Sequence, residues 1–219
     1  MNGFFGKVAS LGDFVSRRLP STFLNPWDAC LQAGLQCSRE RLGEQWLEVY
    51  LCSPIWHFAL AAGVCGDSGW AGVMIPSVDR VGRYFPLTLA TAGEDVPLLA
   101  RLERDVLWYG QLERLALSAL SEVFSLDAFD EALLALPSPG CWTPASYTHD
   151  VSTPARWLDL PDPERIGDGM PQLSAQIDAL GLAGHSLFWT EGSPRVAPSI
   201  WVGEGLPDGE TFADMIGGL

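Results

Sequence analysis

Two hydrophobic periods alternate along the chain, and each predicts a different kind of element. Short apolar or aromatic runs bounded by glycine or proline are typical of strands. Such runs occupy residues 3–8, 56–61, 71–76, 84–92, 186–192 and 197–205. Apolar residues at steps of three and four predict helices instead. This second pattern occupies residues 21–42, 95–124, 127–136, 172–180 and 208–219.

Two of the predicted helices carry further signals. The pattern over residues 21–42 rests on four apolar residues at helical spacing, Phe23, Trp27, Leu31 and Leu35. Gly43 is the predicted end of that helix. Proline is tolerated near a helix start, so Pro26 predicts that the helix begins at Asn25. Residues 95–124 form the longest periodic segment, and the longest helix is predicted there.

The order of the elements predicts one α+β domain. Strands lie at both ends of the chain with helices between them, and this order favours a central, mainly antiparallel sheet with helices packed on its faces. Residues 137–169 are rich in proline, glycine, serine and aspartate, which predicts a loop. We therefore expect residues 1–219 to form a single domain. It has an N-terminal part (1–92) and a part with later helices and strands (93–219).

A charged stretch, IPSVDRVGRYFPL at residues 75–87, separates two apolar runs. Because the link is short, these runs should pair as antiparallel strands through a tight connection that contains Gly82. Phosphate binding, catalysis, a structural turn and a docking surface are all compatible with its charges. Two arginines near Asp13 repeat the pattern after the first strand, and interfaces are enriched in arginine and tyrosine. The residues predicted to contact a partner are therefore Arg17, Arg18, Asp79, Arg80, Arg83 and Tyr84.

Charge is distributed unevenly along the chain. The formal net charge is −14, and residues 1–84 hold equal numbers of basic and acidic side chains, so residues 85–219 carry the whole excess. Such acidity argues against nonspecific nucleic-acid binding, which requires lysine and arginine to replace counterions. Lys7 is the only lysine. The other cations are arginines, whose planar guanidinium suits fixed ion pairs better than diffuse attraction.

The cysteines, histidines, serines and glycines of the chain lack the spacing that is typical of metal, cofactor or catalytic sites. The five cysteines include no CxxC pair, so free thiols in a reducing compartment are expected. The chain has neither a glycine-rich phosphate loop nor a GxSxG elbow. His57, His149 and His185 have no catalytic partner at informative spacing. No apolar run approaches the roughly 20 residues of a membrane helix, and no signal pattern opens the chain. We therefore expect a cytoplasmic protein with no metal, no cofactor and no direct membrane insertion.

Four blocks of the N-terminal part carry a family resemblance. They are GFFGKVASLGDFVSRRLP (3–20), WDACLQAGL (27–35), SPIWHFAL (53–60) and WAGVMIPSVDRVGRYFPLTLA (70–90). They resemble the TagF family, accessory proteins of bacterial type VI secretion systems. The family motifs Gly-Phe-x-Gly-Lys, Gly-Asp-Phe and Pro-Ser-x-Asp-x-x-Gly-Arg-x-(Phe)-Pro occur in order. Beyond residue 95 the resemblance rests on size and helical pattern.

The resemblance implies a stand-alone member of the family, without the phosphatase domain that some members carry. It implies a cytoplasmic, post-translational repressor of type VI secretion that acts by binding, without catalysis or cofactor. The implied partner is a forkhead-associated (Fha) scaffold protein. Two alternatives stay open: a structural subunit of the secretion machinery, and a hydrolase that uses Asp79 and one histidine. Residues 75–87 would build a corner of the fold and also present part of the docking face.

Overall fold

The strands of the protein form one antiparallel sheet. The computed structural model describes residues 1–93, 98, 101, 105–121, 123–137, 139, 156–158 and 184–218. The described strands are β1 (Asn2–Gly6), β2 (Val15–Arg17), β3 (Trp56–Leu60), β4 (Gly69–Ile75), β5 (Leu87–Gly93), β6 (Arg156–Leu158), β7 (His185–Thr190) and β8 (Ser199–Glu204). Their order in the sheet is β2-β1-β5-β4-β3-β7-β8-β6, and every neighbouring pair is antiparallel.

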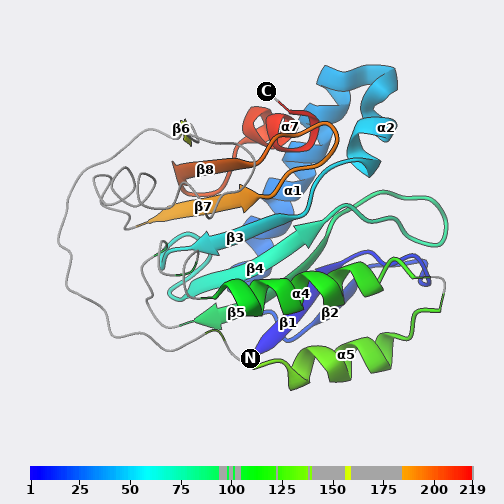
Figure 1. Cartoon of the computed structure of the whole chain (residues 1–219), viewed down its shortest axis with the longest axis vertical. Coiled ribbons are helices and arrows are strands. Elements are labelled where there is room, and N and C mark those ends of the chain that lie inside the picture. The colour runs from blue at the N-terminus through cyan, green and yellow to red at the C-terminus, as the bar shows by residue number, and fades with distance from the viewer. Residues whose placement is uncertain are drawn as a thin grey trace.

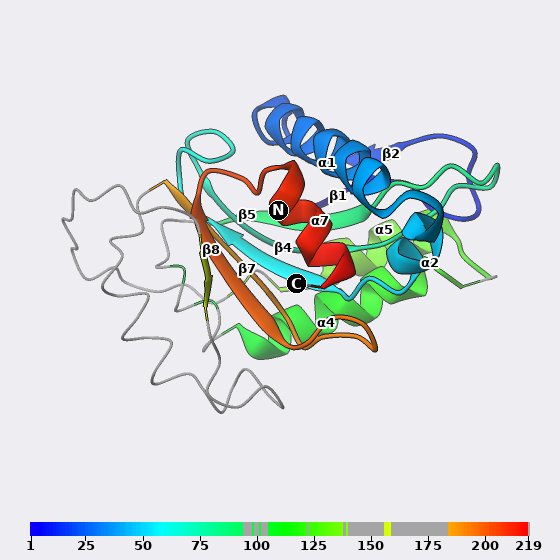
Figure 2. The ribbon, with the colours of Figure 1, turned by 90° about the horizontal axis from the view of Figure 1, so that it is seen from above.

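Helices cover both faces of this sheet. The described helices are α1 (Ser21–Leu42), the 3-10 turn η1 (Gly43–Gln45), α2 (Trp46–Leu51), α4 (Val106–Ser118), α5 (Leu126–Ala135) and α7 (Gly209–Gly217). Helices α1, α2 and α7 lie on one face, and α4 and α5 lie on the other (Figures 1 and 2). The late strands rejoin the sheet, because β7 pairs with β3. The predicted α+β domain with a mainly antiparallel sheet is confirmed.

Helix α1 occupies the whole periodic segment, residues 21–42, so the prediction that it begins at Asn25 is wrong. The carbonyl of Pro20 accepts hydrogen bonds from the backbone N–H of Phe23 at 3.0 Å and of Leu24 at 2.9 Å. These bonds close the first turn before Pro26, which lies inside the helix. Packing of the apolar stripe of α1 against the sheet therefore outweighs the loss of one helical hydrogen bond at the proline.

The prediction that residues 95–124 form the longest helix is also wrong. Helix α4 has 13 residues, whereas α1 has 22. Asp105 stands outside the helix, and a turn follows Ser118, where Ala119 donates to the carbonyl of Ala116 at 3.1 Å. The apolar periodicity continues beyond these ends because non-helical residues such as Ala119 are also buried in the core. Residues 94–97, 99–100, 102–104 and 122 lie outside the described part.

Part of the predicted loop at 137–169 is a strand. Residues 156–158 form β6 at the edge of the sheet, with Trp157 opposite Trp201 of β8. A three-residue strand is too short to show an alternating pattern, and the proline-rich and aspartate-rich sequence around it indicated a loop. Nearly all of the remaining residues of 137–169, and the predicted helix at 172–180, lie outside the described residues.

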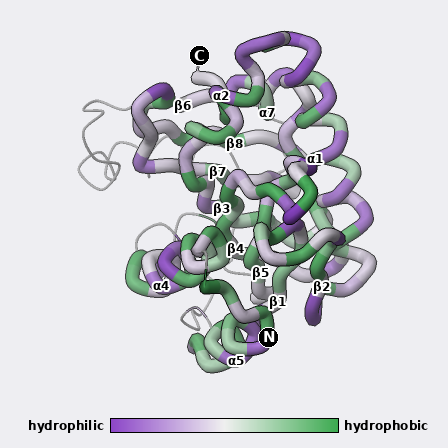
Figure 3. The backbone as a smooth tube through the Cα atoms, turned by 90° about the vertical axis from the view of Figure 1, so that its right-hand side faces the viewer, coloured by the Kyte–Doolittle hydropathy of each residue, from purple (hydrophilic) through white to green (hydrophobic). Residues whose placement is uncertain are grey.

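Each face of the sheet carries its own apolar core. On the face of α1, α2 and α7, Trp27 packs on Phe58 with ring centroids 4.5 Å apart and donates to Thr88 Oγ1 at 2.9 Å. On the face of α4 and α5, His57 stacks on Trp189 and Tyr109 donates to the carbonyl of Phe58. Hydrophobic residues concentrate in the strands, and the outer side of α1 is hydrophilic (Figure 3). Among the described helices, none combines the length and the hydropathy needed to cross a membrane.

Candidate docking corner

Two loops pack against each other at one end of the sheet, and together they hold the charged stretch of the sequence. One is the β4–β5 connection, residues 76–86, and the other follows β1, residues 7–14 (Figure 1). Arg80 N donates to the carbonyl of Leu11 at 2.9 Å, and the Arg83 guanidinium donates to the carbonyl of Gly12. We call residues 7–14 and 76–86 the docking corner. The antiparallel pairing of β4 with β5 through a connection containing Gly82, which has φ +84°, is confirmed.

A buried ion cluster holds the two loops together. Asp79 Oδ2 accepts from Lys7 Nζ at 3.0 Å and from Arg83 Nε at 2.7 Å. Asp79 Oδ1 accepts from the backbone N–H of Val81 at 3.0 Å and of Arg83 at 2.9 Å. The Asp79 side chain is fully buried, and that of Lys7 is 6% exposed. Burial by itself raises the pKa of Asp79, but these four donors outweigh it and hold the pKa well below its usual range.

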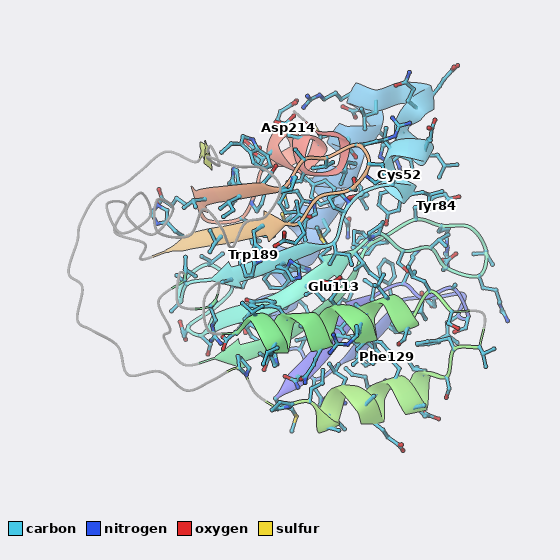
Figure 4. All side chains as sticks on the ribbon, viewed as in Figure 1. Cys52, Tyr84, Glu113, Phe129, Trp189 and Asp214 are labelled. Carbon is cyan, nitrogen blue, oxygen red and sulfur yellow. The ribbon has the colours of Figure 1, made fainter. Side chains whose placement is uncertain are left out.

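Helix α2 is tied to the same corner through Ser77. The Ser77 hydroxyl donates to the carbonyl of Lys7 at 2.7 Å. The Tyr50 hydroxyl donates to the carbonyl of Ser77 and accepts from its N–H, both at 3.0 Å. Tyr84 packs edge-on against Trp46 and Tyr50 with centroid distances of 5.8 Å, and Figure 4 shows it at the end of the sheet near α2. The corner is therefore anchored to the strands and to the helix layer.

Three phenylalanines support the exposed side of the corner. Phe14 stacks on Phe5 at 5.6 Å and meets Phe85 edge-on at 4.9 Å. Lys7 Nζ lies 5.0 Å from the centroid of the Phe14 ring, a cation–π distance. Phe14 nevertheless remains 45% exposed. One side of this large aromatic ring packs on Phe5 and Phe85, and the rest is open to solvent.

The tip of the β4–β5 connection projects into solvent. Arg80 and Gly82 are exposed, and Val81 is 63% exposed. The Arg83 side chain is 56% exposed although it bonds Asp79. The Arg80 side chain forms no ion pair or hydrogen bond with any residue of the described ranges. The tip therefore combines an unpaired cation with an exposed apolar side chain.

The structure separates the six predicted contact residues into two groups. Asp79, Arg80, Arg83 and Tyr84 lie together in the docking corner. The Asp79 side chain has no exposed surface, so it contributes to a contact face only by holding its neighbours.

Arg17 and Arg18 lie away from that corner, toward the other end of β1, where Arg17 is opposite Phe4. The Arg18 guanidinium donates to the carboxylate of Asp130 on α5 and to the carbonyl of Asn2 at 2.8 Å. Arg17 Nε is 3.9 Å from the same carboxylate. The acid that pairs with these arginines is therefore Asp130, and not Asp13, which is near them in the sequence. Their hydrogen bond and charges lower the pKa of Asp130, with the Arg18 bond as the largest cause.

Sequence reasoning missed four residues of the corner: Lys7, Phe14, Ser77 and Val81. Lys7 and Asp79 are 72 residues apart in the sequence, and no local pattern pairs them. One signal was present, since the only lysine of the chain lies near the end of the first predicted strand, residues 3–8. A lone lysine among arginines at a strand end is compatible with a specific partner, but nothing in the sequence identified Asp79 as that partner.

The described histidines and cysteines form no cluster that could bind a metal ion. His57 on β3 is buried, as expected for a packed strand residue, and its Nε2 lies 3.2 Å from Glu113 Oε2. His149 and Cys141 lie outside the described residues. Cys30, Cys37, Cys52 and Cys65 are free thiols. Within the described part of the chain, no group of three histidine, cysteine or acidic side chains could hold a metal ion.

Comparison with known proteins places this fold and corner in a family. Residues 3–136 match the family described as "TagF N-terminal domain, Type VI secretion system-associated". No curated protein sequence matches the chain. Among solved structures, the crystal structure of PA0076 from Pseudomonas aeruginosa PAO1 superimposes with a TM-score of 0.80 at 36% sequence identity. The similarity covers 100% of this chain and 95% of that one. The chain therefore belongs to the family of type VI secretion-associated proteins that carry a TagF N-terminal domain.

Proposed function

We propose that the protein is a post-translational repressor of type VI secretion that acts by binding an Fha scaffold protein. The observation that supports this most is the convergence of the family motifs at one place. Gly-Phe-x-Gly-Lys ends at Lys7 of the docking corner, and Gly-Asp-Phe and the motif at residues 76–86 lie within it. These motifs come from two distant segments, which are joined by the bonds of Lys7 to Asp79 and of Arg83 to Gly12. Loops on a rigid scaffold are where binding residues concentrate. The corner is therefore our candidate for the contact face.

The chemistry of the corner favours binding over catalysis. The charged groups of Lys7, Asp79 and Arg83 are hydrogen-bonded to one another. A catalytic acid or base must instead reach a substrate. The groups left to solvent are the Arg80 guanidinium, part of the Arg83 side chain, Val81 and the Phe14 ring. Arginine and aromatic side chains are enriched at protein interfaces.

Deleting the gene should increase type VI secretion, and overproducing the protein should silence it. Because repression is post-translational in this proposal, the amounts of the other secretion proteins should stay unchanged in both strains. The measurement is the quantity of a secreted component in culture supernatant, together with co-purification of the protein with the Fha scaffold. Loss of secretion on deletion would instead indicate a structural subunit, and a proportionate fall of all components would indicate a change in expression.

Single alanine variants of Arg80 and Arg83 should separate an effect on scaffold affinity from an effect on folding stability. Arg83→Ala should weaken scaffold binding by about 1–3 kcal/mol. It should also lower the melting temperature by a few degrees, because the Arg83 guanidinium joins Asp79 to Gly12. Arg80→Ala should weaken binding with an unchanged melting temperature, since its side chain has no partner among the described residues.

The matched control for these variants is Arg114→Ala, which removes an exposed arginine from α4 on another part of the surface. Scaffold affinity is measured by isothermal titration calorimetry, and folding by circular dichroism. If folded Arg80 and Arg83 variants bind the scaffold as tightly as the unaltered protein, the docking corner is not the contact face.

A further inference from the structure

The exposed groups of the docking corner indicate what kind of surface it recognises. We propose that it binds an acidic, apolar segment of the protein partner. In this arrangement Arg80 pairs with a carboxylate, and Val81 and Phe14 contact the apolar side chains beside it. This inference rests on the proposed function for the existence of a partner, and it adds the chemistry of the partner's contacting segment.

The tip that carries Arg80 and Val81 is held in one conformation. Asp79 N donates to the carbonyl of Arg83, and Gly82 N donates to the carbonyl of Asp79, both at 3.0 Å. The Asp79 carboxylate fixes the N–H groups of Val81 and Arg83 as well. A segment fixed before binding loses little conformational entropy on binding, which favours affinity. The buried cluster therefore presents the exposed tip in a preformed state.

Arg80 has no carboxylate partner among the described residues, unlike the arginines that form ion pairs. Within the described residues, the arginines whose guanidinium groups lie against carboxylates are Arg17, Arg18, Arg41, Arg83, Arg101 and Arg195. Arg80 has no such partner in the described ranges, although the chain carries a net charge of −14. Its guanidinium lies against Gly12, 3.7 Å from the position a Cβ would take there. An open cation in an otherwise acidic protein is complementary to an anionic group on a partner.

The apolar part of the surface lies next to that cation. Val81 is the next residue after Arg80, and Phe14 follows Gly12 by two positions. Their exposed fractions are 63% and 45%. Because Phe5 and Phe85 hold the Phe14 ring from behind, its ordering is complete before a partner arrives. An apolar centre with a charged rim is the usual composition of a protein interface.

A carboxylate fits this surface better than a phosphate. Phosphorylated side chains are recognised by clusters of arginines, which donate several hydrogen bonds to the phosphate oxygens. At the corner, Lys7 is buried against Asp79, and Arg83 donates to Asp79 and Gly12. Arg80 is the corner cation whose guanidinium has no acceptor among the described residues. Arg83 is half exposed, but its guanidinium is already bonded to Asp79 and Gly12. A single guanidinium without an acceptor, beside apolar side chains, suits a single carboxylate.

The first arm of the test uses defined peptides and does not depend on the scaffold. Isotope-labelled whole chain is titrated with a short peptide of alternating glutamate and leucine, with the same peptide carrying lysine for glutamate, and with a leucine peptide carrying one phosphothreonine. The acidic peptide should shift the backbone amide signals of Phe14, Val81 and Gly82 in nuclear magnetic resonance spectra. Equal shifts with the lysine peptide, shifts with the phosphothreonine peptide alone, or no shifts at the corner would overturn the inference.

The second arm measures affinity for the Fha scaffold with charge-changing variants. Arg80→Glu and Val81→Asp should each weaken binding by about tenfold or more. Arg114→Glu and Val123→Asp are matched controls on exposed residues elsewhere and should bind as the unaltered protein does. If folded Arg80→Glu and Val81→Asp bind the scaffold as tightly as the unaltered protein, the inference is overturned and the proposed function stays intact. A scaffold that fails to bind the unaltered protein, while the acidic peptide shifts the corner, would overturn the proposed function and leave the inference intact.

Discussion

Asp79→Ala is expected to lower the melting temperature by on the order of 10 °C and to abolish binding at the docking corner. The change leaves the Lys7 ammonium buried without its counterion, and breaking one side of a buried pair is far more damaging than the net contribution of the pair. It also releases the N–H groups of Val81 and Arg83. Thermal unfolding and scaffold affinity, measured on the same preparation, check both effects.

Lys7→Met is the informative control for this variant. It removes the buried ammonium together with its demand for a counterion, and Asp79 keeps three of its four donors. The melting temperature should therefore fall less than in Asp79→Ala, and the tip should keep enough order to bind. A larger fall in Lys7→Met than in Asp79→Ala would contradict the view that Asp79 is the centre of the cluster.

The same carboxylate gives the protein a specific pH dependence. The pKa of Asp79 is lowered in the folded state, so its contribution to stability is complete above the unfolded pKa of about 4. The contribution is lost as the pH falls from there through the folded pKa. The difference in melting temperature between the unaltered protein and Asp79→Asn should therefore narrow below about pH 4. A difference that stays constant down to pH values near 2 would show that the charge of Asp79 is not its source.

Local periodicity predicted most of the elements because those elements bury one face. The stripe of Phe23, Trp27, Leu31 and Leu35 specified α1, since all four side chains are buried in one apolar core. The apolar runs on either side of residues 75–87 specified β4 and β5, and the short link between them left only an antiparallel pair. Where apolar residues are buried outside regular structure, as at Ala119, the same periodicity extended a helix too far.

Long-range pairing could not be predicted from local pattern. The position of β1 between β2 and β5, and the return of β7 to β3, depend on which edges meet in three dimensions. The candidate site was found in part, because charges between two apolar runs marked Asp79, Arg80 and Arg83. Its other half was missed, since the Lys7–Asp79 pair is created by β1 lying beside β5. The pairing of Arg18 with Asp130 likewise follows from the placement of α5 against β1.

Gly6→Ala tests whether the close contact of β1 with β5 holds the docking corner in place. Gly6 has φ +142°, and a Cβ there would lie 2.1 Å from the carbonyl oxygen of Pro86 and 2.8 Å from Leu87 Cα. These are backbone atoms, so β1 must move away from β5 to admit a methyl group. The substitution should therefore destabilise the fold by about 3 kcal/mol or more. It should also weaken scaffold binding, because Lys7 is the next residue.

The matched control for Gly6→Ala is Gly82→Ala in the same corner. Gly82 also has a positive φ, of +84°, but nothing lies within 4 Å of the position of its Cβ. Alanine there should cost only about 1–2 kcal/mol, from the backbone conformation alone. The difference between the two variants in denaturant unfolding therefore reports the steric contact with Pro86 together with the less favourable φ of Gly6. Equal unfolding midpoints would mean that β1 and β5 are not in the close contact that places Lys7 against Asp79. A Gly6→Ala protein found only in the insoluble fraction, beside a soluble Gly82→Ala protein, agrees with the contact.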